Sequence, residues 1–337
     1  MMYASAMGAP RSDTKTGTCS GFFRLETPRS PLQDGLRDRT KMVATARDFD
    51  KTLREMANQP NQMQADYWNG IGGTQWVNRK ERFDSQLGTF IPLIVDSLEL
   101  RPNDAVLDIG CGTGALTRAL ADKVPDGSAL GLDISEAMIE DALASRGERT
   151  NLDFRIADIQ TASHPGIAPR AIASRFGVMF FSQPTKAFEN LASWAAPEAE
   201  LCFVCWQSPQ LNPWIGLPGE LAEPFIGAPP ALEPGQPSPF AFADPNLIAS
   251  ILSTSGWTEQ AIHAVKTHLY IGGPGSLDQT VEFVLGGTSL AIGMREADPE
   301  SVAKATDAVH AGLAPYHDGI GVRMDCAIWL VRATKAG

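Results

Sequence analysis

The sequence predicts an α/β fold built around a mostly parallel sheet. The first observation is a short apolar run at residues 105–107, typical of a buried strand, which a glycine-rich loop and a helical pattern follow at once. The second is a regular alternation of strand-like and helix-like segments that continues to residue 206. Such alternation is typical of parallel strands joined by crossover helices.

The loop after the first strand indicates a ligand site. Asp108 ends the strand, and Gly110, Gly112 and Gly114 follow at alternate positions. Glycine lets the backbone turn sharply and lets a ligand approach without a Cβ in the way. The helix behind the loop contributes free N–H groups and the positive end of its dipole. This combination predicts a nucleotide-type site at the carboxyl edge of the sheet.

The remaining elements follow in order along the chain. Further strands are expected at 128–132, 152–157, 171–176, 201–206, 263–271 and 323–332. Helices are expected at 136–145, with Ser135 as N-cap, and at 185–195, 244–255, 277–285 and 300–313. The third of these opens on Asp244-Pro, a favourable helix start. An intermittent apolar face predicts helical structure between 62 and 98.

Two nucleotides compete for the loop. Residues Gly110 to Ala115 formally satisfy the dinucleotide fingerprint, and Asp133 stands about where a ribose-binding acid is expected, so an NAD(P)-dependent oxidoreductase is an alternative. Other features favour a different cofactor. Asp108 directly precedes the loop, where a carboxylate can receive an ammonium group, and Asp133 and Asp158 end the next two strands. The sequence also has no Tyr-x-x-x-Lys pair.

The segment 108–114 matches, position for position, the D-x-G-x-G-x-G motif of class I S-adenosylmethionine (SAM) dependent methyltransferases, which the chain resembles from about residue 62 to the C-terminus. The segment 174–181 is similar to a signature of the quinone-biosynthesis C-methyltransferases and related bacterial small-molecule enzymes. This resemblance implies a doubly wound seven-stranded sheet of order 3-2-1-4-5-7-6. The last strand is antiparallel, and helical cap and lid insertions are added.

The resemblance further implies SAM as cofactor and methyl transfer to a small aromatic or apolar metabolite. Asp133 is expected to accept both ribose hydroxyls, Asp158 the adenine amino group, and Asp108 the ammonium group. A catalytically silent SAM-binding protein is a further alternative. The full set of expected cofactor contacts is Tyr67, Trp68, Asp108, Gly110, Cys111, Gly112, Gly114, Asp133, Ile134, Met138, Ala157, Asp158, Ile159, Ser174, Arg175 and Phe176.

The acceptor side is less defined. Phe180, Phe181, Trp206 and Trp214 are expected to line the substrate pocket, and the acid that the family usually carries before the fourth strand is absent. His317 is the predicted catalytic base, because it precedes an antiparallel strand that should begin at the edge where the fourth and fifth strands end. No residue spacing indicates a metal site, so none is expected. The pair Cys202 and Cys205 is interpreted as core.

Composition divides the chain into three parts. Residues 1–55, rich in Ser, Thr, Arg and Pro, are expected to form a weakly ordered extension. The resemblance implies that residues 56–98 form a helical cap and that residues 99–337 form the SAM-binding domain. Insertions at about 207–241, which is rich in Pro and Gly, and 272–321 should leave the carboxyl edge of the sheet and act as a lid.

Charge and hydropathy restrict the partners. The net charge is −11 and no basic stripe occurs, so nucleic acid is not an expected partner. No run of about 18 apolar residues occurs, so no membrane span is expected. Five scattered cysteines fit the reducing cytoplasm. The expected partner is a small-molecule acceptor, and a homodimer is left open.

Overall fold

The central element of the fold is a seven-stranded sheet with strand order β3-β2-β1-β4-β5-β7-β6. The computed structural model describes residues 61–228, 236–287 and 290–337, so the predicted extension 1–55 lies outside the described residues. Strands β1 to β5 are parallel, and β7 runs antiparallel to both β5 and β6. The predicted strand order and antiparallel last strand are therefore confirmed. The strands are β1 (Ala105–Ile109), β2 (Ser128–Asp133), β3 (Leu152–Ile156), β4 (Ala171–Arg175), β5 (Glu200–Trp206), β6 (Trp257–Tyr270) and β7 (Arg323–Lys335).

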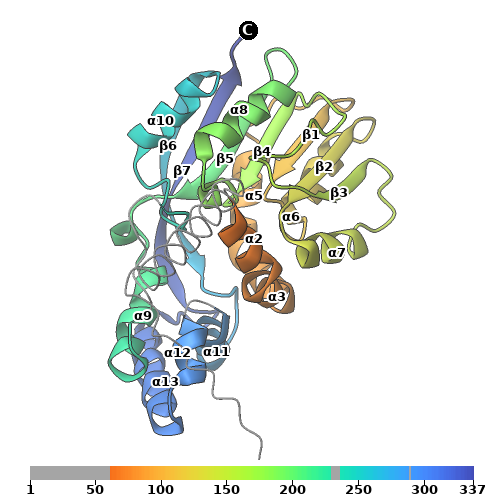
Figure 1. Cartoon of the computed structure of the whole chain (residues 1–337). Coiled ribbons are helices and arrows are strands. Elements are labelled where there is room, and N and C mark those ends of the chain that lie inside the picture. The colour runs from red at the N-terminus through yellow and green to blue at the C-terminus, as the bar shows by residue number, and fades with distance from the viewer. Residues whose placement is uncertain (1–60, 229–235, 288–289) are drawn as a thin grey trace, which may run out of the picture. The chain divides into compact units, whose positions relative to one another are not determined.

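Helices cover both faces of this sheet, as its continuously apolar strands require. Helices α5 (Ile91–Val95) and α6 (Ala115–Lys123) pack together on one face, and α8 (Pro184–Trp194) and α10 (Pro245–Thr254) pack together on the other (Figure 1). Helix α7 (Glu136–Ala144) packs on β2 and β3. Ser135 is the N-cap of α7, as predicted, and accepts from Met138 N, while Asp244 is the N-cap of α10 and accepts from Asn246 N.

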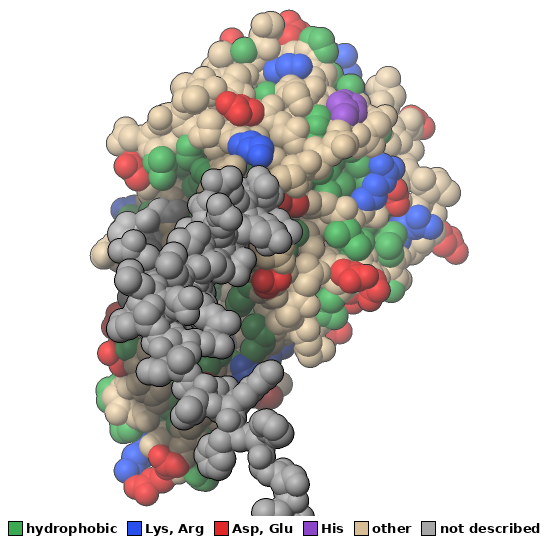
Figure 2. Space-filling view, in the orientation of Figure 1, with side chains coloured by type: hydrophobic (Ala, Val, Ile, Leu, Met, Phe, Trp, Pro, Cys, Tyr) green, Lys and Arg blue, Asp and Glu red, His purple; other side chains and the backbone are tan. Residues whose placement is uncertain are grey.

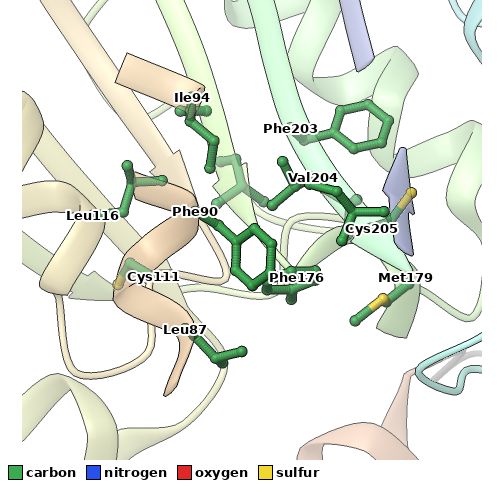
Figure 3. Packing of buried hydrophobic residues seen from close by; sticks show 14 of the residues in the cluster. Leu87, Phe90, Ile94, Cys111, Leu116, Phe176, Met179, Phe203, Val204 and Cys205 are labelled. Atoms are coloured by element: carbon green, nitrogen blue, oxygen red, sulfur yellow. The ribbon is translucent and has the colours of Figure 1, made fainter. Parts of the chain in front are cut away.

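One group of large apolar side chains packs between the sheet and the helices that precede it in the sequence. Phe90 lies edge-on to Phe176 and to Trp206, with ring centroids 5.1 and 5.6 Å apart. Figure 3 shows Phe90 and Phe176 beside Leu116 and Val204, side chains that come from four separate elements or loops. This packing holds the segment that begins at Phe176, after β4, against the helices that precede the sheet in the sequence.

The predicted helical region before the sheet is a series of short helices. They are α2 (Gln62–Asn69), α3 (Ile71–Asn78), α4 (Lys80–Leu87) and the 3-10 turn η1 (Gly88–Phe90), which leads into α5. The breaks fall at Gly70 and Arg79, whose backbones leave the helical region of φ and ψ.

Strands β6 and β7 continue beyond the edge of the sheet as a two-stranded ribbon. Trp206, the last residue of β5, pairs with Ile328, whereas β6 and β7 stay paired as far as Tyr270 and Arg323. Five further residues of β7 therefore extend past β5, which corresponds to roughly 17 Å. The sequence predicted a sixth strand of only 263–271.

A helical group lies at the far end of the ribbon (Figure 1). It comprises α9 (Pro213–Ile226), α11 (Leu277–Gly287), α12 (Leu290–Glu296), α13 (Pro299–Leu313) and the turn η4 (Ala314–Tyr316). Helix α9, preceded by the turn η3 (Pro209–Leu211), was not expected in a Pro- and Gly-rich segment. It forms despite internal prolines because Ala222 is buried and Leu221 packs on Gly312 of α13, where a Cβ would come within 2.3 Å of Leu221 Cδ1.

The visible surface mixes charges of both signs. Figure 2 shows acidic and basic side chains interspersed over the described part of this face rather than collected in one stripe. None of the helices among the described residues is both long enough and apolar enough to cross a membrane.

Candidate cofactor site

Three acids stand in a row at the carboxyl edge of the sheet. Asp108 is the next-to-last residue of β1, Asp133 is the last residue of β2, and Asp158 follows the end of β3 by two residues. These strands are neighbours in the order β3-β2-β1, so the acids line one pocket, which encloses about 840 Å³ including its open mouth. That volume is in the range of small-molecule sites.

The glycine loop is shaped for close approach. Gly110 and Gly112 have φ of 62° and 54°, a left-handed conformation that favours glycine. A Cβ on Gly110 would lie 2.8 Å from Gly177 Cα, so the loops after β1 and β4 touch through their backbones. A Cβ on Gly112 would meet only Met138 Sδ at 3.5 Å and Trp76 Nε1 at 3.8 Å. The Gly112 backbone therefore faces the pocket.

Asp133 fixes this loop to the next one. Its Oδ2 accepts a hydrogen bond from Gly112 N at 2.8 Å, and its Oδ1 accepts one from Ser135 N at 2.9 Å. Burial raises the pKa of Asp133, and these backbone donors partly oppose the rise. Each carboxylate oxygen has a second lone pair, so a preoriented acceptor remains for two ligand hydroxyls.

Asp108 is held by one oxygen only. Its Oδ2 accepts from Thr117 Oγ1 at 2.6 Å, whereas its Oδ1 is buried and has no partner. Burial raises the pKa of Asp108 to about 7, and the Thr117 hydrogen bond acts in the opposite direction. A cation placed at Oδ1 would satisfy this oxygen and favour its ionised form.

Unpartnered polar atoms concentrate in this pocket. Among the described residues, seven buried side-chain nitrogen and oxygen atoms lack a hydrogen-bond partner, and four of them belong to residues that line it. The four are Asn61 Oδ1, Asp108 Oδ1, Trp76 Nε1 and Arg175 Nη1. Buried polar atoms in proteins are normally paired, so this set marks where a ligand supplies the partners. The ammonium and adenine amino groups of SAM fit the two oxygens of Asp108 and Asn61, and its oxygen atoms fit the nitrogen of Trp76.

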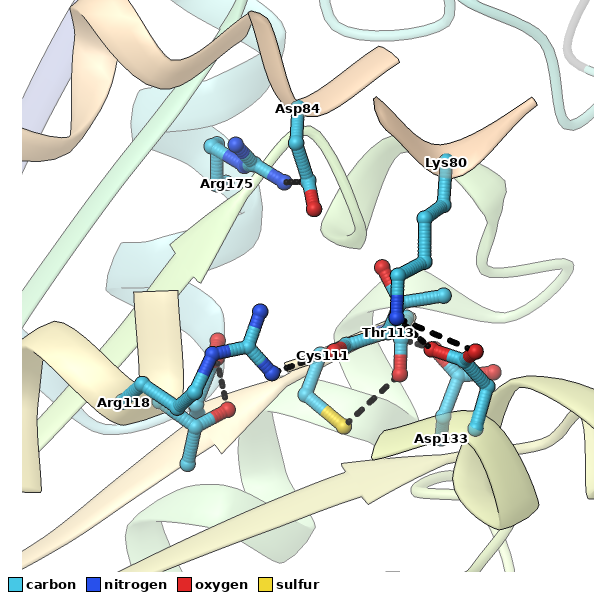
Figure 4. Close-up of polar contacts among 11 residues, drawn as sticks. Lys80, Asp84, Cys111, Thr113, Arg118, Asp133 and Arg175 are labelled. Carbon is cyan, nitrogen blue, oxygen red and sulfur yellow. Dashed lines mark hydrogen bonds and ion pairs between the residues drawn. The ribbon is translucent and has the colours of Figure 1, made fainter. Parts of the chain in front are cut away.

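Most of the predicted cofactor contacts come together here. The pocket lining includes Trp68, Asp108, Gly110, Cys111, Gly112, Asp133, Ile134, Met138, Ala157, Asp158, Ile159, Arg175 and Phe176, together with Phe180 and Phe181. Asp158 Oδ1 accepts from Asn61 Nδ2 at 3.2 Å and from Gln160 N at 3.0 Å. Figure 4 shows how Asp133, Cys111 and Thr113 are placed around the loop.

Three predicted cofactor residues lie outside the lining. Ser174 is buried and joins two strands, because its Oγ donates to Ile109 O at 2.7 Å and accepts from Gly177 N at 3.2 Å. Gly114, with φ of 82°, precedes α6 and packs on Phe154. Tyr67 is about half exposed. These residues shape or border the site without facing it.

The two predicted pocket tryptophans lie behind the lining. Trp206 stacks on Phe176 with ring centroids 4.1 Å apart, and Trp214 lies edge-on to Trp206 at 5.1 Å. Trp214 Nε1 donates to Asn212 Oδ1 at 3.3 Å. They support Phe176, which does reach the pocket.

His317 lies away from the site, contrary to the geometric expectation. The β6–β7 ribbon carries it past the sheet edge, whereas the prediction assumed that β7 begins level with the end of β5. Both ring nitrogens contact backbone: Nδ1 accepts from Gly319 N at 3.2 Å, and Nε2 lies 3.1 Å from Gly275 O. His317 therefore closes a loop near the helical group.

Six lining residues were not predicted: Asn61, Gln64, Trp76, Leu116, Leu132 and Gly177. Leu116 and Leu132 are sequence neighbours of the glycine loop and of Asp133, so their positions were available from the motif. Trp76 stacks on Phe83 with ring centroids 4.1 Å apart. Its Nε1 is buried without a partner and faces the glycine loop. No sequence pattern indicates that orientation.

Comparison with known proteins agrees with this geometry. A family model described as a methyltransferase domain matches residues 106–198, which hold all three acids and Arg175. Residues 106–198 form a methyltransferase domain.

Relatives of this methyltransferase domain act on varied substrates. Trans-aconitate 2-methyltransferase of Methylobacterium radiotolerans is 28% identical over 53% of this chain and 60% of its own length. Nocamycin O-methyltransferase of Saccharothrix syringae is 32% identical over 32% of this chain and 37% of its own length. The chain thus spans less than two thirds of either relative. Magnesium protoporphyrin IX methyltransferase from Synechocystis, solved with bound SAH, aligns at 15% identity over 82% of this chain and 99% of its own, with a TM-score of 0.47.

Proposed function

We propose that this protein binds SAM and transfers its methyl group to a small aromatic or apolar metabolite. The observation that carries the proposal is the row of three strand-end acids in a pocket that also contains four buried, unpartnered polar atoms. Asp133 would accept the ribose hydroxyls, Asp158 together with Asn61 Oδ1 the adenine amino group, and Asp108 Oδ1 the ammonium group. The aromatic residues Trp68, Phe180 and Phe181 would form the acceptor side.

When bound, SAM would supply an electrophilic methyl group for the acceptor's nucleophile and would leave as S-adenosylhomocysteine (SAH). The protein's residues hold the two reactants in line and exclude water. The lining among the described residues includes no histidine. We propose that the rate enhancement comes from positioning, and that any proton on the acceptor is lost to solvent after the product leaves the site.

Thermal unfolding with candidate cofactors tests the proposal. At 100 times its Kd, a ligand adds roughly 2.7 kcal/mol of stability. SAM and SAH should raise the melting temperature, and NADH should leave it unchanged. Stabilisation by NADH and not by SAH would favour the oxidoreductase instead. Transfer of an isotope-labelled methyl group from SAM to a metabolite in a cell extract, followed by mass spectrometry, would separate an active enzyme from a silent SAM-binding protein.

The remaining assignments stay proposals. The helices of the insertions would form a lid over the pocket. Phe283 of α11 contacts Phe83 of α4, and Phe83 stacks on Trp76, which lines the pocket.

A cytoplasmic location is supported by four cysteines that are free and buried, which are Cys111, Cys202, Cys205 and Cys326. Cys202 and Cys205 are three residues apart on β5, so they point to opposite faces of the sheet. A homodimer stays a prediction that sedimentation would test.

A further inference from the structure

The acceptor side of the pocket contains a buried arginine that its protein partners do not satisfy. Arg175 ends β4, one strand beyond Asp108 in the sheet, and only 7% of its side chain is exposed. Its Nη2 contacts Asp84 Oδ1 at 3.2 Å (Figure 4), whereas its Nη1 is buried and has no hydrogen-bond partner. An arginine stays protonated in a protein, so the unpartnered donor is available to an anionic ligand.

The charge of Arg175 is also incompletely balanced. Asp84 approaches through a single oxygen, not in the two-point arrangement that pairs a guanidinium fully, and 24% of its side chain is exposed. Asp108 is the other acid in electrostatic contact with Arg175, and it is held mainly by Thr117. The free edge of the guanidinium therefore has the geometry and the charge to receive a carboxylate.

The surroundings of this edge define the rest of the ligand. Phe176 follows Arg175 directly, and Phe180 and Phe181 come after the next short turn; all three line the same pocket. Phe176 cannot move aside easily, because it is stacked on Trp206 at 4.1 Å and lies edge-on to Phe90. Aromatic walls around a single buried cation suit a flat apolar body that carries one anionic group.

We propose that the methyl acceptor is an aromatic carboxylic acid whose carboxylate binds Arg175. This inference rests on the proposed function, and it names the class of its acceptor. The other anion that could reach Arg175 is the carboxylate of the cofactor itself, and the experiment must separate the two.

Equilibrium binding of 4-hydroxybenzoate to the full chain saturated with SAH, measured by calorimetry, provides the test. 4-Hydroxybenzamide is the neutral match of the same shape. We expect the carboxylate to bind at least about tenfold more tightly than the amide, and Arg175→Gln to abolish this preference while leaving SAH affinity within about twofold. Arg82→Gln is the matched control, because Arg82 also has buried unpartnered nitrogens but lines a different pocket.

A second variant changes the result in the opposite direction. Asp84→Asn keeps the size of the partner and removes its charge, so carboxylate binding should tighten by about threefold or more. This variant also covers the case in which Arg175→Gln does not fold.

The inference is overturned if 4-hydroxybenzoate and 4-hydroxybenzamide bind with the same affinity. It is also overturned if Arg175→Gln lowers SAH affinity as much as it lowers the affinity for the carboxylate, because Arg175 would then bind the cofactor. Failure of the wild-type chain to bind SAH would instead overturn the proposed function.

Discussion

At the scale of single residues, Asp133 joins the fold to the site. Replacing it with Ala removes the proposed acceptor for the ribose hydroxyls, so SAM affinity should fall by about 1.5–3 kcal/mol. Calorimetric titration measures the change, and Asp153→Ala serves as control because Asp153 is an exposed acid on β3. Unchanged affinity in a folded Asp133→Ala variant would remove the ribose assignment.

Asp108 makes cofactor affinity depend on pH. Its pKa is about 7 without ligand, and a bound cation favours the ionised form, so binding must release a proton below that pH. SAM affinity should therefore rise by about tenfold between pH 6 and pH 8. The same titration on Asp108→Asn isolates this effect from the titration of the ligand. An equal rise in the variant would show that Asp108 is not the group responsible.

The acids were predictable from the sequence because each directly follows an apolar strand, and parallel strands end at a common edge. Arg175 was expected as a cofactor contact, but its bare Nη1 depends on where Asp84 of α4 lies, and no local pattern encodes that distance. Trp76 was missed for the same reason.

At the scale of elements, Asn212 connects β5, α9 and β7. It is fully buried, and its Nδ2 donates to Ala327 O at 2.9 Å while its Oδ1 accepts from Ala327 N at 3.0 Å. Asn212→Ala would leave Ala327 N without its acceptor, whereas Ala327 O would still accept from Gln207 N, so the free energy of unfolding should fall by about 1–3 kcal/mol. Denaturant unfolding measures the loss.

Asn212→Asp is the matched comparison, since it keeps an oxygen for Ala327 N but removes the donors. It should also destabilise the chain, because Asp brings a charge into a buried position. A stability of Asn212→Ala equal to that of wild type would mean that η3 and α9 are not anchored through this residue.

Elements with strong periodicity were predicted to within a few residues, as for β2, β5, α8 and α13. Helix α9 was not, because Pro218 and Pro224 oppose a helix locally and only packing against α13 compensates. The length of β6 was also missed, since its exposed residues show no continuous apolar run. The length of β6 is determined by its pairing with β7 beyond the end of β5. Because of this long-range pairing, His317 lies far along the ribbon and not at the site.

At the scale of the whole molecule, Asp108 links ligand-free stability to pH. Its folded pKa of about 7 lies above the value of about 3.9 for an unfolded chain, so the folded state binds more protons between these values. The free energy of unfolding should therefore fall as pH rises through this window, by about 3 kcal/mol between pH 5 and pH 8 from this group. Comparing wild type with Asp108→Asn by thermal unfolding isolates this contribution, and parallel curves would contradict it.

The stacked pair of Trp76 and Phe83 also has an optical consequence. The indole N–H of Trp76 is buried without a partner at the glycine loop, and the ring lies flat on Phe83 with centroids 4.1 Å apart. Indole emission depends on the hydrogen bond and the polarity at that nitrogen. A cofactor that supplies the missing acceptor changes both, while the stack keeps the ring in place. The chain therefore contains its own fluorophore for cofactor occupancy, and Phe83 connects it to Phe283 of α11.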